Sequence, residues 1–461
     1  MCHERLVIEQ YSKPKTEPAI LVLIEPQFRT KFGDTIWDIT GRIARMAAFE
    51  GALASAQAAT GLIPETSAKS IVRVCKTALP EANDLYEKAK VAGNPAIPFL
   101  NYLTTAVASE DSNAAAHVHF GATSQDLIDS ANMMALAEIA DALDSMLLEV
   151  ASDLRKLAIA HTETPMVART LLQQATPITF GLKAALWGIA ITQTRKQLKA
   201  ARCNDMAVQL GGSNGTLSAM APHGPAVRAD TAARLGLTDP DHCWHVLRGR
   251  ILTISTTFAA LVGAAAKISG DCILMMQTEV GELQEASPGG SSAMPQKKNP
   301  VDALVPIAAL PLAATHLSAM TASQMHAHER AAGPWHSEWI TLPVLTSLTL
   351  ASIESLMGML SGLKINTSQM KANLARTGGT LAAEELAATL VESVGRNEAH
   401  NLIRTLVEQS DYENFADTIR SNTKLSGLIS ESRLSEILSY KGPLAAAAQE
   451  AQKLVNTISN S

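Results

Sequence analysis

Aromatic residues are scarce in this 461-residue chain: Phe, Trp and Tyr together make up 4% of it, although 47% of the residues are hydrophobic. Strands favour aromatic and β-branched side chains, whereas Ala, Leu and Met, which dominate the apolar residues here, are strong helix formers. The shortage of aromatic residues therefore argues against a β-rich fold and predicts a nearly all-α protein.

Cysteine is also sparse and is not arranged for metal binding. The chain has five cysteines, Cys2, Cys75, Cys203, Cys243 and Cys272, and no two of them have a CxxC spacing. This pattern excludes the common zinc motifs and a disulfide framework. We expect reduced thiols in a cytoplasmic protein.

The sequence lacks a long basic stretch as well. It has 38 Lys and Arg against 44 Asp and Glu, a net charge of −6, which argues against nucleic acid or an anionic membrane as a partner. The segment 1–15 mixes charged and apolar residues and has no signal-peptide core. An anionic substrate would have to be held by local cations against the overall charge.

Helical patterning divides the chain into three expected domains: an N-terminal helical domain (1–105), a central long-helix domain (106–362) and a C-terminal helical domain (363–461). After Asp126, apolar residues recur at alternating spacings of four and three, which is typical of a long bundle helix. The stretches expected to be helical in and before the central domain are 34–60, 126–157, 178–203, 226–236, 247–284, 301–324 and 337–362.

The central helices carry more Ala and Leu than one chain is expected to bury. Such an excess of apolar surface favours helices that are donated to an oligomeric bundle. After residue 362 the predicted helices are shorter and more polar, at 367–376, 380–394 and 397–409.

A loop within the central domain carries the most informative motif. Gly289–Pro300 reads Gly-Gly-Ser-Ser-Ala-Met-Pro-Gln-Lys-Lys-Asn-Pro, and its glycines and prolines exclude a helix interior or a central strand. The hydroxyls of Ser291 and Ser292 stand near the ammonium groups of Lys297 and Lys298 in the chain. A potential base beside a cation is what proton abstraction next to a carboxylate requires.

This loop resembles the signature loop of the fumarase/aspartase superfamily, G-S-S-x-M-P-x-K-x-N-P, at every fixed position. The resemblance extends over essentially the whole chain. It implies a three-domain all-α fold whose long helices form a twenty-helix core in a homotetramer, with each active site shared by three subunits and no cofactor or metal. It also implies that loop 286–300 closes over a polycarboxylate, with Ser291 as proton shuttle and Lys297 and Asn299 stabilising the aci-carboxylate intermediate.

A second block, His119–Asp126, reads His-Phe-Gly-Ala-Thr-Ser-Gln-Asp at the start of a long predicted helix. Thr123, Ser124 and Asp126 are all favourable at a helix N-terminus, so simple capping is one interpretation. The other is that the helix end and the two hydroxyls bind a carboxylate. The block resembles the first conserved region of the superfamily, in which these hydroxyls bind substrate and the His lies in the pocket.

A third block, Arg169–Gly181, resembles the region that reads R-T-H in fumarases and in several C–N lyases. The His of that motif, the usual general acid, is Leu171 here. The Glu that holds it, seven residues after Lys297, is Leu304. Both members of the acid dyad are therefore replaced together, which favours a leaving group too weakly basic to need protonation, such as a carboxylate.

One branch of the superfamily forms and breaks such a bond, the 3-carboxy-cis,cis-muconate cycloisomerases of aromatic compound degradation through β-ketoadipate. The chain resembles that branch in several further segments and departs from it at Leu171, Gly249 and Gln296–Lys298. The resemblance predicts interconversion of 3-carboxy-cis,cis-muconate and 4-carboxymuconolactone. The matching segments are 172–175, 276–282, 328–330, Trp244, His245, Arg248, Arg250, Trp335 and Trp339.

Two alternative functions remain open. Some relatives eliminate an amine from a substituted aspartate or succinate without the His, so a C–N lyase is the first alternative. A non-catalytic structural protein is the second, and the intact set of Ser291, Lys297 and Asn299 argues against it.

The remaining candidate residues are assigned partly by the resemblance. His119 is grouped with the catalytic residues, and Arg330 in a His-Glu-Arg sequence is a carboxylate clamp. His326 and His328 point to different helix faces, so no metal site is expected there. The predicted substrate-binding set is Thr123, Ser124, Arg169, Gln173, Thr216, Ser292, Asn299 and Arg330.

Overall fold

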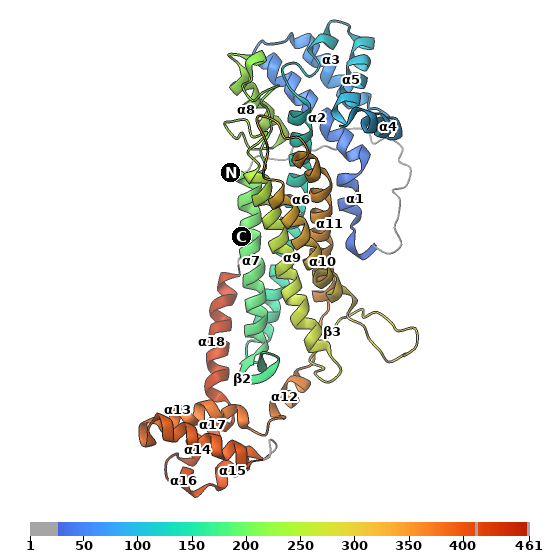
Figure 1. Cartoon of the computed structure of the whole chain (residues 1–461). Helices are drawn as coiled ribbons and strands as arrows, with labels where there is room; N and C mark the ends of the chain where they lie inside the picture. The colour runs from blue at the N-terminus through green and yellow to red at the C-terminus, as the bar shows by residue number, and fades with distance from the viewer. Residues whose placement is uncertain (1–25, 411–413, 459–461) are drawn as a thin grey trace. The chain divides into compact units, whose positions relative to one another are not determined.

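The computed structural model describes residues 26–410 and 414–458, and it is built almost entirely of helices (Figure 1). Helices account for 70% of the residues and strands for 5%, against roughly a third helix in an average globular protein. The predicted all-α fold is confirmed.

The chain divides into two compact units. Unit 1 comprises Met1–Met146, Thr194–Ala266 and Val305–Glu354, and unit 2 comprises Leu147–Gln193, Lys267–Leu304 and Ser355–Ser461. The division cuts through the long helices, so it follows different boundaries from the predicted three domains, which stay a prediction.

The N-terminal part of unit 1 is a set of short helices, and its first predicted helix is in fact two. The expected helix 34–60 is interrupted at Asp38, whose side chain accepts a hydrogen bond from Gly41 N and caps α2. The helices are η2 (Pro26–Phe28), α1 (Lys31–Trp37), α2 (Ile39–Ala59), α3 (Glu65–Thr77), α4 (Ala82–Ala92), α5 (Ala96–Glu110), η3 (Ala114–His117), η4 (Ser218–Met220) and α8 (Gly224–Leu235).

Five long helices run through both units: α6 (Ser124–Ala160), α7 (Phe180–Asn204), α9 (Gly249–Met276), α10 (Val301–Ala322) and α11 (Pro334–Leu360). The predicted seam of α6 is buried, with Leu136, Leu143 and Leu147 inaccessible to solvent. The expected helix 247–284 is too long, because α9 ends at Met276 and the chain turns through Gly281 at φ +62°.

Three of these helices, α9, α10 and α11, are long and apolar enough to cross a membrane by length and composition alone. The buried share of the most apolar window is 56% in α9 and 61% in α11, but only 33% in α10. The helices α9 and α11 thus behave as bundle core, whereas α10 leaves much apolar surface uncovered within this chain.

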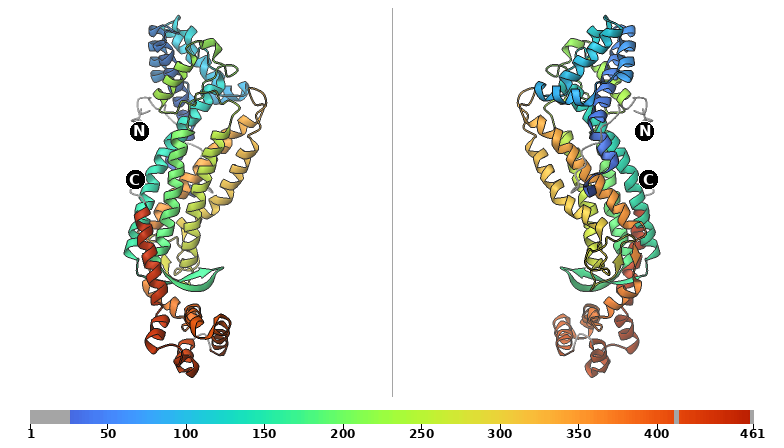
Figure 2. Two further views of the ribbon diagram at one scale, coloured as in Figure 1. Left: turned by 90° about the vertical axis from the view of Figure 1, so that its left-hand side faces the viewer. Right: turned by 90° about the vertical axis from the view of Figure 1, so that its right-hand side faces the viewer.

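Unit 2 contains a feature that the sequence did not predict, a β-hairpin between α6 and α7. Strands β1 (Pro165–Thr170) and β2 (Gln173–Thr179) pair antiparallel, and Figure 2 shows the hairpin projecting beyond the ends of the two helices. Its two-residue turn is Leu171–Leu172, both with positive φ, at +50° and +65°. A second small sheet pairs β3 (Leu283–Gln284) with β4 (Lys364–Ile365).

The C-terminal part of unit 2 is a cluster of short helices, as predicted for 367–409. Its core includes Leu386, Leu390, Phe415 and Ile437. The helices are α12 (Thr367–Ala375), η5 (Thr380–Ala382), α13 (Ala383–Val394), α14 (Arg396–Gln409), α15 (Phe415–Ser421), α16 (Thr423–Ser426), α17 (Glu431–Leu438) and α18 (Lys441–Thr457).

Candidate active site

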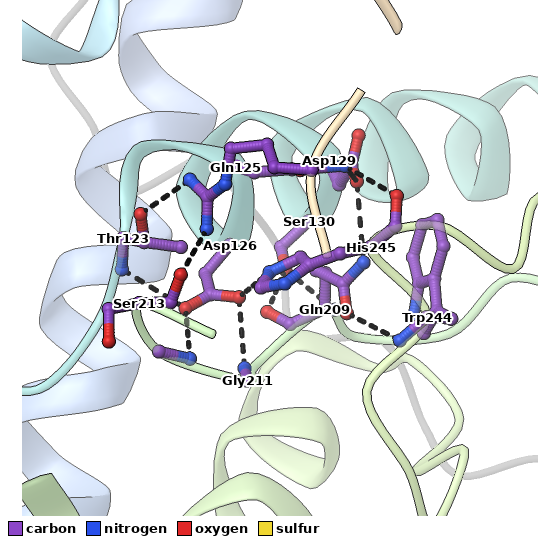
Figure 3. Close-up of polar contacts among 12 residues, drawn as sticks. Thr123, Gln125, Asp126, Asp129, Ser130, Gln209, Gly211, Ser213, Trp244 and His245 are labelled. Atoms are coloured by element: carbon purple, nitrogen blue, oxygen red, sulfur yellow. Dashed lines mark hydrogen bonds and ion pairs between the residues drawn. The ribbon is translucent and has the colours of Figure 1, made fainter. Parts of the chain in front are cut away.

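The N-terminus of α6 in unit 1 is organised around the carboxylate of Asp126, which solvent does not reach (Figure 3). Asp126 accepts hydrogen bonds from Thr123 N at 3.0 Å, from Gly211 N and Gly212 N at 2.9 Å each, and from His245 Nε2 at 2.7 Å. The bond to Thr123 N is the capping-box bond from the third helical position back to the N-cap. Asp126 therefore joins the 119–126 block, the 211–216 turn and His245.

The electrostatics of this cluster favour an imidazolium at His245. Burial disfavours the charged ring, but the hydrogen bonds and charges of Asp126 and Cys243 outweigh it and raise the pKa of His245 to about 9. At neutral pH His245 and Asp126 therefore form a buried ion pair. This pair holds the start of α6 in position.

The guanidinium of Arg330 contacts the block that was predicted to bind a carboxylate. Its Nη1 donates to Thr123 Oγ1 at 2.8 Å, and its Nη2 donates to Ser213 O at 2.9 Å. Within the described residues, neither Thr123 Oγ1 nor Ser124 Oγ accepts a hydrogen bond from a helix N–H. Asp126 therefore caps this helix end, and the Thr123 hydroxyl lies beside a guanidinium, as an anion site requires.

His119 precedes this block and has a partner that the sequence did not reveal. Its Nδ1 lies 2.6 Å from Oε1 of Glu50 on α2, and the Glu50 side chain is only 1% exposed. Burial lowers the His119 pKa, yet the charge and hydrogen bond of Glu50, with a smaller contribution from Asp126, raise it overall. The sequence feature that could have revealed this partner is the single carboxylate, Glu50, within the apolar run Met46–Ala54.

The 211–216 turn supplies Ser213 O to the cluster, but the predicted ligand Thr216 faces solvent. Its hydroxyl donates to Asn214 Oδ1 at 2.7 Å. Unit 1 thus brings together His119, Thr123 and Arg330, and the role of Thr216 stays a prediction.

A buried charge network supports the first turns of α6. Arg248 donates to both Asp129 and Glu338, and Trp335 Nε1 donates to Asp129 at 2.9 Å. Burial raises the pKa of Glu338 to about 6 even though Arg248 opposes the rise. The network explains why the chain places Trp335 and Arg248 near the 119–126 block: they hold its helix.

In unit 2, a backbone ladder closes the signature loop at its base. Gly289 N donates to Asn299 O and Asn299 N donates to Gly289 O, both at 2.8 Å, and Asn299 Nδ2 donates to Gly290 O at 2.7 Å. A Cβ on Gly289 would overlap the Val301 side chain, so only glycine fits there. The amide of Asn299 thus shapes the loop; its predicted contact with substrate stays a prediction.

At the tip of this loop, Ser291 Oγ accepts hydrogen bonds from Met294 N at 3.1 Å and from Ala293 N at 3.4 Å. Two amide donors on one hydroxyl oxygen stabilise negative charge on that oxygen. Ser292 and Lys297 are exposed. Among the residues that the structure describes, no group bonds to Lys297 Nζ, so its ammonium group remains available to an anion.

The hairpin carries the other predicted residues of unit 2. Both Nη atoms of Arg169 bond to the buried Glu282, at 2.7 and 2.9 Å, and Asn373 Nδ2 also donates to Glu282 at 2.9 Å. Arg169 is therefore held by a carboxylate of its own chain, and binding of substrate by Arg169 stays a prediction. Gln173 is exposed, so its role also stays a prediction.

Both positions that the acid dyad would occupy carry exposed leucines. Leu171 is 96% exposed at the hairpin tip, and Leu304 is 51% exposed on α10. Across residues 26–410 and 414–458, no group of three or more His, Cys, Asp or Glu side chains is arranged to hold a metal ion.

Comparisons with known proteins agree with this geometry. A family described as lyase matches residues 26–309. The chain is 36% identical to a 3-carboxy-cis,cis-muconate cycloisomerase of Bradyrhizobium diazoefficiens over 92% of this chain and 96% of the relative. It is 39% identical to the enzyme of the same name from Pseudomonas aeruginosa over 80% of this chain and 82% of that relative.

The solved structures agree with these relatives. The 3-carboxy-cis,cis-muconate lactonizing enzyme of Pseudomonas putida superposes with a TM-score of 0.87 at 32% identity, covering 95% of this chain and 98% of that one. A relative with a different name, a nitrosuccinate lyase of Streptomyces davaonensis, is 35% identical over 88% of both chains.

Proposed function

The chain belongs to the lyase family of the fumarase/aspartase superfamily, and we propose that it interconverts 3-carboxy-cis,cis-muconate and 4-carboxymuconolactone. Such an enzyme acts in aromatic compound degradation, in the branch that leads to β-ketoadipate. The observation that carries the proposal is the pairing of an amide-bound Ser291 with apolar residues at both acid-dyad positions.

The leaving group accounts for the missing dyad. In the lactone-opening direction the bond between a ring carbon and a carboxylate oxygen breaks, and the released carboxylate has a conjugate-acid pKa of roughly 4. Such a group leaves without protonation. The reaction therefore needs no general acid, and leucines at positions 171 and 304 do not impair it. A hydroxide or amide leaving group would need the acid that this chain lacks.

Ser291 moves the proton. When the lactone forms, a substrate carboxylate oxygen adds to one carbon of the double bond, and the electron pair shifts to the neighbouring carbon and its carboxylate. Ser291 Oγ–H then delivers a proton to that carbon. The resulting alkoxide is stabilised by Met294 N, Ala293 N and the ammonium of Lys297. The reverse reaction returns the proton to Ser291.

The unit 1 cluster binds the other carboxylates of the substrate. Arg330 and the Thr123 hydroxyl are already in contact, and Ser124 and His119 border them in the chain. Together they supply a guanidinium, two hydroxyls and an imidazolium, a set suited to carboxylate oxygens. Ser292, Thr216, Gln173 and Arg169 complete the proposed substrate contacts.

The active protein is proposed to be a cytoplasmic homotetramer without a cofactor, with a twenty-helix core and sites shared between subunits. The exposed apolar residues of α10 support this assembly, because a soluble monomer would leave them in water. They include Val301, Leu304, Ile307, Leu310 and Leu312.

The function is tested by the ultraviolet absorbance of 3-carboxy-cis,cis-muconate, which falls as the conjugated diene is consumed. Ser291→Ala is expected to lower kcat by about 10²- to 10⁴-fold, since it removes the proton donor. Ser109→Ala, at an exposed serine of α5 whose hydroxyl donates to Thr105 O, is the matched control and is expected to retain the activity. Absence of turnover by the folded wild-type protein, or equal losses in both variants, would contradict the proposal.

The nitrosuccinate lyase relative supports a second candidate, elimination of nitrite from a nitro-substituted succinate. Nitrite, like a carboxylate, is a weak base, so this C–N cleavage also needs no general acid. Release of fumarate from nitrosuccinate, without turnover of the muconate, would establish this function instead.

A further inference from the structure

Glu50 is the carboxylate in an otherwise apolar run of α2, Met46–Ala54. It follows Ala47, Ala48 and Phe49 on a buried face, and its own side chain is 1% exposed. Burying a carboxylate costs several kcal/mol unless a charged or hydrogen-bonding partner compensates. The compensating contact is with His119 Nδ1, at 2.6 Å.

The backbone around His119 is held in place for this contact. His119 has φ +57°, in the left-handed region that few non-glycine residues occupy. The next residue is also fixed from α2, because Gln57 Nε2 donates to Phe120 O at 2.6 Å. Two side chains of one helix therefore set the position of the imidazole.

The second ring nitrogen is left without a partner. Because Nδ1 faces Glu50, Nε2 points to the other side of the ring, and no described residue bonds to this buried nitrogen. An unmade hydrogen bond at a buried polar atom is costly, so such an atom in a native site calls for a ligand. Thr123, four residues further along the same block, has its hydroxyl on Arg330 and is the proposed position of an anion.

We propose that Glu50 is a positioning residue that keeps His119 as an imidazolium, with Nε2–H directed at a carboxylate of the substrate. The inference rests on the proposed function and assigns the pair to anion binding rather than to proton transfer. A base at Nε2 would need the neutral ring, which the Glu50 carboxylate opposes. Proton transfer is left to Ser291.

The surrounding charges agree with this assignment. Asp126, at the start of α6, adds a second negative charge that favours the imidazolium, and its carboxylate is saturated by its own four contacts. Cys75 on α3 lies near Glu50, and burial raises the pKa of its thiol, so it stays neutral. Two positive charges also border the block: His245, which is paired with Asp126, and Arg330, whose contact with Thr123 Oγ1 favours an anion there.

The test measures binding of propane-1,2,3-tricarboxylate, a saturated probe, by calorimetry between pH 6 and 10. Glu50→Gln is expected to weaken binding by about 10- to 100-fold at pH 7.5, since the neutral ring loses a charged hydrogen bond. In the wild-type protein, affinity falls as pH rises through the His119 pKa. In Glu50→Gln this fall moves to lower pH, because the charge and hydrogen bond that raise the His119 pKa are lost.

Three further variants make the result specific. Glu50→Asp keeps the charge and is expected to restore part of the affinity, whereas His119→Gln removes the His119 contribution to the pH dependence and leaves that of the His245–Asp126 pair. Cys75→Ala, a buried substitution beside Glu50, is expected to leave affinity and its pH dependence unchanged. Unaltered affinity and pH dependence in folded Glu50→Gln would overturn the inference.

The same variants separate this inference from the proposed function. If the muconate is turned over but the kcat and KM of Glu50→Gln match the wild type at every pH, the positioning role is wrong and the function stands. If the muconate is not turned over but the probe binds in a Glu50-dependent manner, the function is wrong and the positioning role stands. In an active enzyme, we expect Glu50→Gln to raise KM more than it lowers kcat.

Discussion

At Asp126, four hydrogen bonds converge on a carboxylate that water does not reach. The sequence predicted its position in the first turn of a long helix, because Thr-Ser-x-Asp is a recognisable helix start. It did not predict the bonds to Gly211 and His245, which are far away in the chain. Glu50 and Glu282 were missed for the same reason: their partners His119 and Arg169 are brought to them only by the fold.

The ion pair of His245 with Asp126 makes stability depend on pH. The folded-state pKa of His245 is about 9 against an ordinary value of 6.5, so the stabilisation is complete below pH 6.5 and is lost as pH rises through 9. The shift, to which Asp126 and Cys243 both contribute, corresponds to a pH-dependent part of the free energy of unfolding on the order of 3 kcal/mol. Asp126→Asn is therefore expected to lower the thermal midpoint more at pH 6.5 than at pH 9.5.

Calorimetric scans of the wild type and Asp126→Asn at both pH values check this expectation. Asp230→Asn, which removes an exposed carboxylate paired with Arg234 on α8, is the control and is expected to shift the midpoint little at either pH. An equal loss for Asp126→Asn at the two pH values would mean that His245 is not charged in the folded protein.

Among the elements, four of the five long helices were predicted to within a few residues, the expected helix 247–284 overran the end of α9 at Met276, and the β1–β2 hairpin was not predicted. The spacing of apolar residues predicts the helices, as in the seam of α6, and so do the residues that start and stop them. The hairpin has neither signal: β2 contains Pro177, and the turn is Leu171–Leu172 where Asn-Gly is the favoured sequence. A turn with two left-handed leucines costs about 1–2 kcal/mol per residue, and it leaves both side chains exposed.

This strained, apolar tip is expected to serve the active site of another subunit rather than the stability of its own. Leu171→Asn together with Leu172→Gly should raise the thermal midpoint of the protein, because both residues tolerate positive φ. The same change should lower kcat/KM for the muconate by about 10-fold or more, because it removes the apolar tip that is expected to lie at that active site. Both quantities are measured on the purified double variant.

Val91→Ala is the matched control for the hairpin, since Val91 is 90% exposed on α4 and has no proposed role. It should change neither the thermal midpoint nor kcat/KM. A double hairpin variant with wild-type kcat/KM would show that the tip does not take part in the site.

For the whole molecule, the family and the all-α architecture were predicted from the signature loop and the composition, and the comparisons confirm both. The spacing of residues in the sequence did not reveal how the proposed site residues are divided between the two units. Thr123, His119 and Arg330 belong to unit 1, whereas Ser291 and Lys297 belong to unit 2. The proposal of sites shared between subunits expects such a division of the proposed site residues between two units, together with an exposed apolar α10.

The most direct test mixes two inactive variants, Ser291→Ala and Thr123→Val, by joint unfolding and refolding, and then measures turnover of 3-carboxy-cis,cis-muconate. If Ser291 and Thr123 of one site come from different subunits, random mixing restores about a quarter of the sites to wild-type composition. We predict activity near that fraction of wild type, with each variant inactive when refolded alone. No recovery in mixed, folded oligomers would contradict the account of a shared, Ser291-dependent cycloisomerase site.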